Sequence, residues 1–502
     1  MVPPPAKRRR MADFGAPNED DAPSPANNQP NPAALTTGTR SSRSTHLPPL
    51  SALCSHIFAR HFIRLRSNDA LWQKLSPLLA VLPDPLLHPL LENLTKECPT
   101  YLKHEFLVSY FFKGARLTLS EALPGVQTQT IRAIERFPDL SDLELSGFAK
   151  IPDSAFAGPL GKLPHLRRLV LRSVVLSGIF YTPIQSTQGM FTCGAEEPGG
   201  LIKTLHRPSG TESELHIGAK LEVLKVAGIS SWTDGTFAKL MVEELSLPTL
   251  RTLKLAHLHI SDSSIHGLLK RCPRISRLDV SFTSSRQSLG HIQLPPLQKL
   301  MLTATKIPPA SLLSFLPHHS SLTTLSLGAL GSSGPGSVAI DSGLSLTDSV
   351  LRSLIPVLRE LRNLENVSLV GNVKLGATSA QPLVDFVGQV GRRCKWLNLS
   401  ALSSLRSYHL AMLVPDDDEP PPTIQTLLLN NTAIDDEAAP FLAACVSLRW
   451  LEVAETKITK EGLFTVLDSC PDLNTLGLKS CRGVNVADRR RFFEVWEEEH
   501  LN

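Results

Sequence analysis

The stretch LRWLEVAETKITKEGLFTVLDSCPDLNTLGL, residues 448–478, contains the pattern that decides the fold. It opens with LRWLEV and closes with LNTLGL, two instances of the hexamer LxxLxL in which Val453 takes the last Leu position of the first. The segment KEGLFTVLDSCPDL carries apolar residues at the i, i+3 and i+4 spacing of a helix. The hexamer returns along the chain, with the best-spaced neighbours 22 to 30 residues apart, beginning at Leu140, Leu166, Leu221, Leu250, Ile275, Leu297, Leu322, Leu364, Cys394, Ile424, Leu448 and Leu473. This period predicts stacked coils that each contain one short parallel strand and one helix or turn.

The fold class that follows is an α/β leucine-rich-repeat solenoid, a right-handed β-α superhelix of horseshoe shape with about 12 coils. Alternation within each hexamer places the Leu side chains inside and the intervening residues on the concave face. Helical spacing in DSSIHGLLKRCP and DEAAPFLAACVSLRW indicates the convex helices.

Composition supports repeats and argues against several other classes of protein. Hydrophobic residues make up 42% of the 502 residues but aromatic residues only 6%, so Leu, Val and Ala supply the core. The 51 basic and 47 acidic residues nearly balance, which excludes a strongly polycationic nucleic-acid binder. Direct binding to nucleic acid is therefore not expected.

The motifs of common enzymes and cofactor sites are absent from the sequence. It has no GxSxG, GxxxxGK[ST], GxGxxG after a strand, or HExxH, so we expect a non-catalytic binding protein without a cofactor. Its eight cysteines form no CxxC pair, so neither a metal site nor a disulfide framework is expected, and a reducing compartment fits best. Without an apolar run of about 18 residues or a secretory signal, the chain is expected to be soluble, intracellular and not membrane-bound, in the nucleus, the cytoplasm or both.

The chain divides into four predicted regions. Residues 1–45 are rich in Pro, Asn and Ser and are expected to be a disordered tail, in which Lys7, Arg8, Arg9 and Arg10 form a nuclear-import-like tetrad or merely a solvated charge run. Residues 46–136 are predicted to form a helical module and residues 137–485 the repeats, followed by a C-terminal capping helix over 486–502. Insertions at 178–220, 328–343 and 415–422 are expected to be exposed loops.

The helical module carries the functional signal. Its first helix, PLSALCSHIFARHFIRLR, places on one face an apolar stripe that can dock into a partner's groove: Leu50, Leu53, Cys54, Ile57 and Phe58. The alternative is an ordinary core helix. The later segment LPDPLLHPLLENLTKECPTYLKHEF has apolar pairs every three to four residues behind Leu82 and Pro83.

These two segments resemble known adaptor-binding elements. Pro49, Leu50 and Cys54 are similar to the elongin C-binding box of SOCS-box, VHL-like and elongin A proteins, with Phe58 in place of the family's aliphatic residue. The second segment resembles both the start of an F-box and the cullin-contacting segment that follows the elongin-binding box. That resemblance implies cullin-proximal positions at Leu82, Pro83, Leu86, Leu87 and Leu90. The Cys-Pro-Asp-Leu sequence at 470–473, which leads to Cys481, resembles the cysteine-containing repeats of F-box proteins, and we expect these cysteines to be small buried residues.

The concave face is predicted to offer two features to a protein partner. The N-terminal coils collect a basic strip, opposed by Glu222 and Asp279, that would attract acidic or phosphorylated residues: Arg167, Arg168, Arg172, Lys225, Arg251, Lys254, Arg277 and Lys299. In the C-terminal coils, Trp396 and Trp450 flank Thr426, with Leu428 beside them, and are expected to form an exposed aromatic slot. The alternatives are a solvated polar face and tryptophans packed on neighbouring coils.

Together these features resemble the substrate receptors of cullin-RING ubiquitin ligases. The implied partners are an elongin C-like or Skp1-like adaptor, a cullin and an unknown substrate. Two other functions remain open: a leucine-rich-repeat scaffold without a ubiquitin role, such as a nuclear repair or signalling factor, and a leucine-rich GTPase activator.

Overall fold

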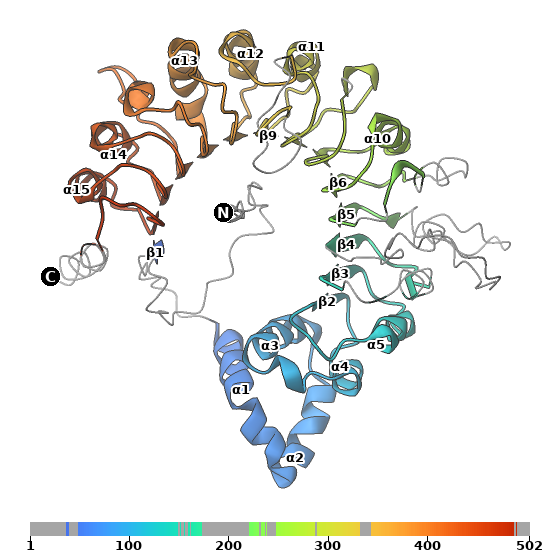
Figure 1. Cartoon of the computed structure of the whole chain (residues 1–502). Coiled ribbons are helices and arrows are strands. Elements are labelled where there is room, and N and C mark those ends of the chain that lie inside the picture. Colours follow the sequence, from blue (N-terminus) through green and yellow to red (C-terminus); the bar gives the residue numbers. More distant parts are fainter. Residues whose placement is uncertain are drawn as a thin grey trace, which may run out of the picture. The chain divides into compact units, whose positions relative to one another are not determined.

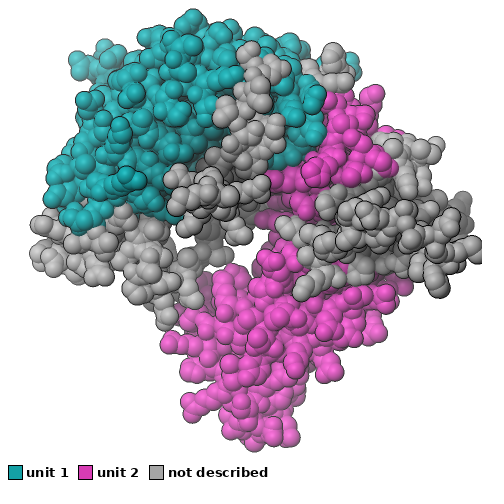
Figure 2. Space-filling view, in the orientation of Figure 1, with its two compact units in different colours: residues 1–44, 280–502 teal, residues 45–279 magenta. Residues whose placement is uncertain are grey.

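The computed structural model divides the chain into two compact units, unit 1 with residues 1–44 and 280–502 and unit 2 with residues 45–279 (Figure 2). It describes residues 37–39, 49–148, 162–172, 220–229, 247–286, 289–331 and 343–485, together with residues 151, 155, 159–160, 232–235, 237 and 488. The tetrad Lys7–Arg10, nearly all of the insertion 178–220 and nearly all of the expected cap 486–502 lie outside the described residues.

Unit 2 begins with helices and continues with a parallel sheet in the order β2 to β7. Its elements are α1 Leu50–Ser67, α2 Asp69–Ala80, α3 Asp84–Glu97, η2 Pro99–Tyr101, α4 His104–Tyr110, β2 Arg116–Ser120, α5 Thr128–Ala133, η3 Ile134–Arg136, β3 Asp142–Ser146, β4 Arg168–Arg172, β5 Val223–Ala227, β6 Thr252–Ala256, α10 Asp262–Leu269 and β7 Arg277–Asp279.

Unit 1 continues the same repeat, with parallel strands β8 to β14 and helices on the opposite side of each coil (Figure 1). Its elements are η4 Leu289–His291, β8 Lys299–Met301, η5 Pro309–Ser311, α11 Leu312–Phe315, η6 Leu316–His318, β9 Thr324–Ser326, α12 Asp348–Glu360, β10 Asn366–Ser368, α13 Gln381–Gln389, η7 Gly391–Arg393, β11 Trp396–Asn398, η8 Ser407–Leu413, β12 Thr426–Leu428, η9 Asp436–Ala438, α14 Ala439–Ala443, β13 Trp450–Glu452, α15 Lys460–Ser469 and β14 Thr475–Gly477. Strand β1, Thr37–Thr39, pairs antiparallel with β14.

The predicted repeat is confirmed coil by coil. Each LxxLxL hexamer begins two residues before a strand; for example, the hexamers at Leu448 and Leu473 precede β13 and β14. The three apolar positions of both hexamers are buried, so the Leu side chains form the interior as alternation requires.

A turn of constant geometry follows the strands. Five residues after a strand begins, the backbone turns into the left-handed region, at Ala304 after β8, Gly371 after β10 and Glu455 after β13. At the next residue of several coils a buried side chain donates a hydrogen bond to the carbonyl three residues earlier, as Thr305 does to Leu302 at 2.8 Å. Asn372 does so to Leu369 at 2.8 Å. These bonds satisfy carbonyls inside the tight turn and offset the cost of a non-glycine residue at positive φ.

Asp348, at the start of α12, connects two neighbouring coils of unit 1. Its buried carboxylate accepts hydrogen bonds from the amides of Gly376 at 2.6 Å, Thr378 at 2.9 Å and Ser379 at 2.9 Å, and from the Thr378 hydroxyl at 2.7 Å. Burial alone raises the pKa of Asp348, but the hydrogen bonds lower it by more, so its pKa is below the usual 3.8.

Two predicted features need correction. The repeat sheet begins at β2, Arg116–Ser120, inside the region 46–136 that was predicted to be wholly helical. The tail 1–45 contains the strand β1, whereas its composition predicted disorder throughout. The loop 415–422 is largely exposed, as predicted, and Arg392 binds it through Glu419 and the Pro420 carbonyl.

Candidate docking surface on the N-terminal helices

Helix α1 is held in unit 2 by one narrow face. Along its length only Ser55, Ala59 and Phe62 are buried. The Phe62 ring lies 5.9 Å from Trp72 of α2 and 5.4 Å from Phe106 of α4, both in edge-on geometry. Such aromatic contacts fix the rotation of α1 about its axis. In Figure 1, α1 and α2 form a hairpin that projects from the other helices of the unit.

The opposite face of α1 presents an apolar stripe to solvent. Leu50 is 76% exposed and Ile57 57% exposed, and Leu53 and Cys54 between them are also exposed. Phe58 is half-buried, with its ring 6.0 Å from Phe62, so it borders the stripe rather than standing in it. The structure therefore brings together four of the five predicted adaptor-binding residues on one exposed surface.

The predicted cullin-proximal segment is wrong at two positions. Leu87 and Leu90 of α3 are each only 5% exposed, because this face of α3 packs inside the helical module. Side chains buried there cannot contact a partner. Leu82 and Leu86 are half-buried, and Pro83 is exposed at the start of α3. Pro89 does not break the helix, which runs unbroken from Asp84 to Glu97.

Helix α2 carries exposed apolar residues that the sequence analysis missed. Leu71 and Leu78 are exposed on α2, and Val81, at its end, is 75% exposed. Their spacing of seven and three residues places them on one face. The only signal in the sequence was this spacing within a segment that also contains Pro77. We call the stripe on α1 and the exposed apolar residues of α2 and its end the docking surface: Leu50, Leu53, Cys54, Ile57, Leu71, Leu78 and Val81.

The basic strip is present on the strands of unit 2, but ion pairs reduce its charge. Lys254 lies 3.4 Å from Asp279, Arg172 3.6 Å from Glu144, and Arg167 3.7 Å from Glu222. Glu144 was not among the acidic residues predicted to oppose the strip. Three of the predicted strip residues are exposed: Arg167, Arg251 and Arg277. Arg168 and Lys254 are half-buried, and Lys225 is buried. Lys299 is half-buried and belongs to unit 1.

The predicted aromatic slot is aligned correctly but is not open. The strand register places Trp396 opposite Thr426 and Thr426 opposite Trp450. However, Trp396 is only 8% exposed, so its ring is packed and not available as predicted. Trp450 and Leu428 are half-buried, and the Trp450 indole donates a hydrogen bond to Glu452 at 3.0 Å. The burial of Trp396 is what the alternative interpretation, a packed ring, expects.

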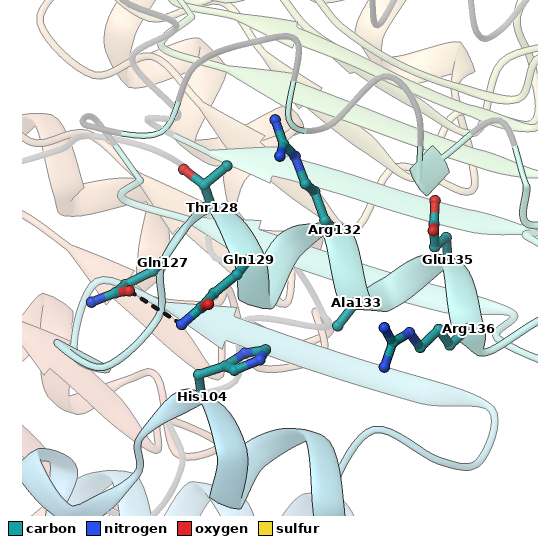
Figure 3. A pocket seen from close by; sticks show the side chains of 8 residues that line it. All are labelled: His104, Gln127, Thr128, Gln129, Arg132, Ala133, Glu135 and Arg136. Atoms are coloured by element: carbon teal, nitrogen blue, oxygen red, sulfur yellow. Dashed lines mark hydrogen bonds between the residues drawn. The ribbon is translucent and has the colours of Figure 1, made fainter.

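A hollow of about 760 Å³ lies elsewhere in unit 2, beside α5 (Figure 3). It is lined by polar and charged residues around Ala133: His104, Gln127, Thr128, Gln129, Arg132, Glu135 and Arg136. His104 bonds to the Thr130 hydroxyl at 3.1 Å, and Glu135 pairs with Lys162 at 3.0 Å. These bonds serve the local structure, and we assign the hollow no part in docking.

The described residues hold no cluster of His, Cys, Asp and Glu suited to a metal ion. In that same part of the chain, no helix combines the length and apolarity needed to cross a bilayer. Burial raises the pKa of Cys272, Cys394 and Cys445 to about 12, which keeps these thiols protonated and unreactive. Cys470 and Cys481 are also buried, as predicted.

Comparison with known proteins adds one family match. Residues 212–292 match the family described as FBD-associated F-box protein At5g56370, LRR repeats. No curated protein sequence matches the chain. The match and the repeating strands define the chain as a leucine-rich-repeat protein, which is the architecture of a protein-interaction module.

Several solved structures are similar to this chain at low sequence identity. A chain in the crystal structure of the yeast Rad7 and Elc1 complex is 15% identical, with 82% of this chain and 90% of that chain covered and a TM-score of 0.46. A leucine-rich-repeat protein of Leptospira interrogans is 16% identical, with 73% of each chain covered and a TM-score of 0.35. The plant peptide hormone receptor RGFR1 in complex with RGF2 is 15% identical, covering 73% of this chain and 51% of that chain with a TM-score of 0.31. At these values the likenesses carry no information about function.

Proposed function

We propose that this chain is a substrate receptor of a cullin-RING ubiquitin ligase that binds an elongin C-like adaptor through helix α1. The observation that carries the proposal is the apolar stripe of Leu50, Leu53, Cys54 and Ile57, which is exposed although the same helix is anchored through Phe62. A helix fixed in this way presents a preformed apolar face, so docking into a groove requires little ordering.

Covering the stripe would contribute part of the binding free energy. Complete burial of a Leu side chain contributes about 1.5–3 kcal/mol, so covering Leu50, which is 76% exposed, contributes about 1–2 kcal/mol. Ile57 adds a contribution of similar size. Small Cys54 between them permits close approach of the partner backbone.

The second part of the proposal concerns the cullin. We place the cullin contact on Leu71, Leu78 and Val81 of the docking surface and on Pro83 beyond it, because these residues are exposed whereas Leu87 and Leu90 are buried. The α1–α2 hairpin then presents both contacts. A Skp1-like adaptor in place of elongin C is the close variant of the same arrangement.

The third part is the role of the repeats. In the proposed function they hold the substrate, and the exposed Arg251 and Arg277 of unit 2 favour a substrate with acidic or phosphorylated residues. The chain forms no bond itself, but raises the effective concentration of a substrate lysine near the conjugating enzyme. Lys7–Arg10 would direct import to the nucleus, and transfer of residues 1–12 to a cytoplasmic reporter tests this; a reporter left in the cytoplasm would refute it.

The test is co-purification of the full chain with elongin C and, separately, with Skp1. A double variant, Leu50→Glu and Ile57→Glu, places two charges in the stripe without touching the buried face. Val446→Glu is the matched control, because Val446 is an exposed apolar residue of unit 1. We expect elongin C to bind the wild type and the control and to be lost from the double variant.

Other outcomes would change the proposal. Binding to Skp1 alone, with the same sensitivity to the double variant, converts the module to a divergent F-box. Retention of elongin C by the double variant refutes the role of the stripe. If neither adaptor binds, the helices serve only as the N-terminal end of the repeats, and a scaffold without a ubiquitin role replaces the receptor.

A further inference from the structure

The outer edge of β14 is the feature that the proposed function does not use. β14 pairs with β13 through Thr475, whose amide donates to the Arg449 carbonyl at 3.0 Å, and through Gly477, whose carbonyl accepts from the Val453 amide at 3.0 Å. Successive residues of a strand direct their N–H and C=O groups to opposite edges. The N–H and C=O of Leu476 therefore point away from β13, toward the other edge. A bare edge of this kind is a template for pairing with another chain.

Residues 37–39 of the same chain lie on this edge. The register is antiparallel and places Thr37 opposite Gly477, Gly38 opposite Leu476 and Thr39 opposite Thr475. Because Leu476 directs its polar groups to this edge, Gly38 and Leu476 form the closely bonded pair that exchanges two N–H···O bonds. The N–H and C=O groups of Thr37 and Thr39 point away from β14.

We propose that the outer edge of β14 is a strand-acceptor site and that the chain's own Thr37–Thr39 occupies it in cis. Occupancy satisfies the backbone of Leu476 and closes the edge against pairing with a second copy of the chain. A strand of three residues makes few hydrogen bonds. It stays paired because residues 37–39 and β14 belong to one molecule, so the effective concentration of the strand at the edge of β14 is high. This inference does not depend on the proposed adaptor or substrate.

The register supplies a matched pair of variants in the full chain. Gly38→Pro removes the N–H that faces Leu476 and puts a ring carbon in its place. Thr39→Pro removes an N–H that points away from β14, where proline is tolerated at a sheet edge. The measurement is hydrogen exchange at the Leu476 amide, with the Leu451 amide of the inner strand β13 as the internal reference.

We expect Gly38→Pro to accelerate exchange at Leu476 by about 2- to 12-fold, which corresponds to the net loss of one hydrogen bond. Thr39→Pro should leave the rate unchanged, and Leu451 should be unaffected in both variants. A peptide of residues 33–43, added to the Gly38→Pro chain, should slow exchange at Leu476 again. The same rate at Leu476 in the wild type and the Gly38→Pro chain would overturn the proposal, as would equal acceleration by Thr39→Pro.

Discussion

The two faces of α1 should respond differently to truncation, and this difference tests the docking surface directly. Phe62 is fully buried, with its ring within about 6 Å of Phe58, Trp72 and Phe106, so Phe62→Ala removes a large side chain from a packed site. Core truncations of this kind cost about 3–5 kcal/mol. Ile57 is 57% exposed, so Ile57→Ala should change the free energy of unfolding by about 0.5 kcal/mol or less.

The assay is hydrogen exchange of the α1 backbone amides in the full chain, because it reports the opening of this helix separately from the unfolding of the repeats. A loss of 3–5 kcal/mol corresponds to acceleration by at least about a hundredfold, as long as exchange occurs through opening of the module. We expect this in Phe62→Ala and less than about threefold in Ile57→Ala. Comparable acceleration in the two variants would refute the reasoning, since it would mean that Ile57 is part of the core.

Three further predictions concern the repeats, the thiols and the basic strip. Asp348→Asn should lower the free energy of unfolding by about 2–3 kcal/mol at pH 7. Asp416 is exposed, so Asp416→Asn should not change it measurably; urea unfolding measures both variants. Folding lowers the pKa of Asp348, so the ionised carboxylate contributes its full stabilisation above the unfolded pKa near 4. This stabilisation is lost as the pH falls through the lower folded pKa. The wild type and the Asp348→Asn variant should therefore become equally stable in acid. A thiol reagent should modify exposed Cys54 in the folded chain and leave Cys394 unmodified until unfolding, since burial raises the pKa of Cys394 to about 12; mass spectrometry that found Cys394 modified first would contradict the structure. Arg251→Glu should weaken binding of an acidic peptide probe at low salt, and a titration in which the variant binds as well as the wild type would exclude the basic strip as an acidic site.

The repeats could be predicted from the sequence because each strand is marked by the alternation of apolar and polar residues within its own hexamer, and the hexamers recur at a regular spacing. Each coil buries the same apolar positions, so a hexamer at Leu448 or Leu473 locates a strand without knowledge of the rest of the chain. The first strand, β2, was missed because its hexamer, GARLTL, has Gly114 where the others have an apolar side chain. Gly114 has φ +80°, and a Cβ on it would lie 2.5 Å from the Asp84 carboxylate of α3. Both the left-handed backbone and the close approach of Asp84 therefore favour glycine here, and the second of these is a tertiary contact.

The helical module could be predicted only in part, because periodicity shows that a helix has an apolar face but not what covers it. Ile57 of α1 and Leu90 of α3 both lie in apolar stripes with helical spacing, yet Ile57 is exposed and Leu90 is buried. Packing among several helices decides between them. Trp396 shows the same limit on the strands: its register could be predicted, but its burial could not.

The position of the docking surface on two consecutive helices is the strongest argument that it binds a partner. Single exposed apolar residues are normal on proteins, and Val373 and Val446 of unit 1 are examples. The docking surface is different because two consecutive helices, α1 and α2, each carry several exposed apolar residues, and a concentration of exposed apolar side chains favours an interaction site. The charge of α1 also limits the partner. Residues 50–67 include three arginines and two histidines but no acidic residue, so pairing of α1 with a second copy of itself would bring like charges together. A groove with apolar walls and an acidic rim avoids that repulsion, and this favours a different protein over self-association as the occupant.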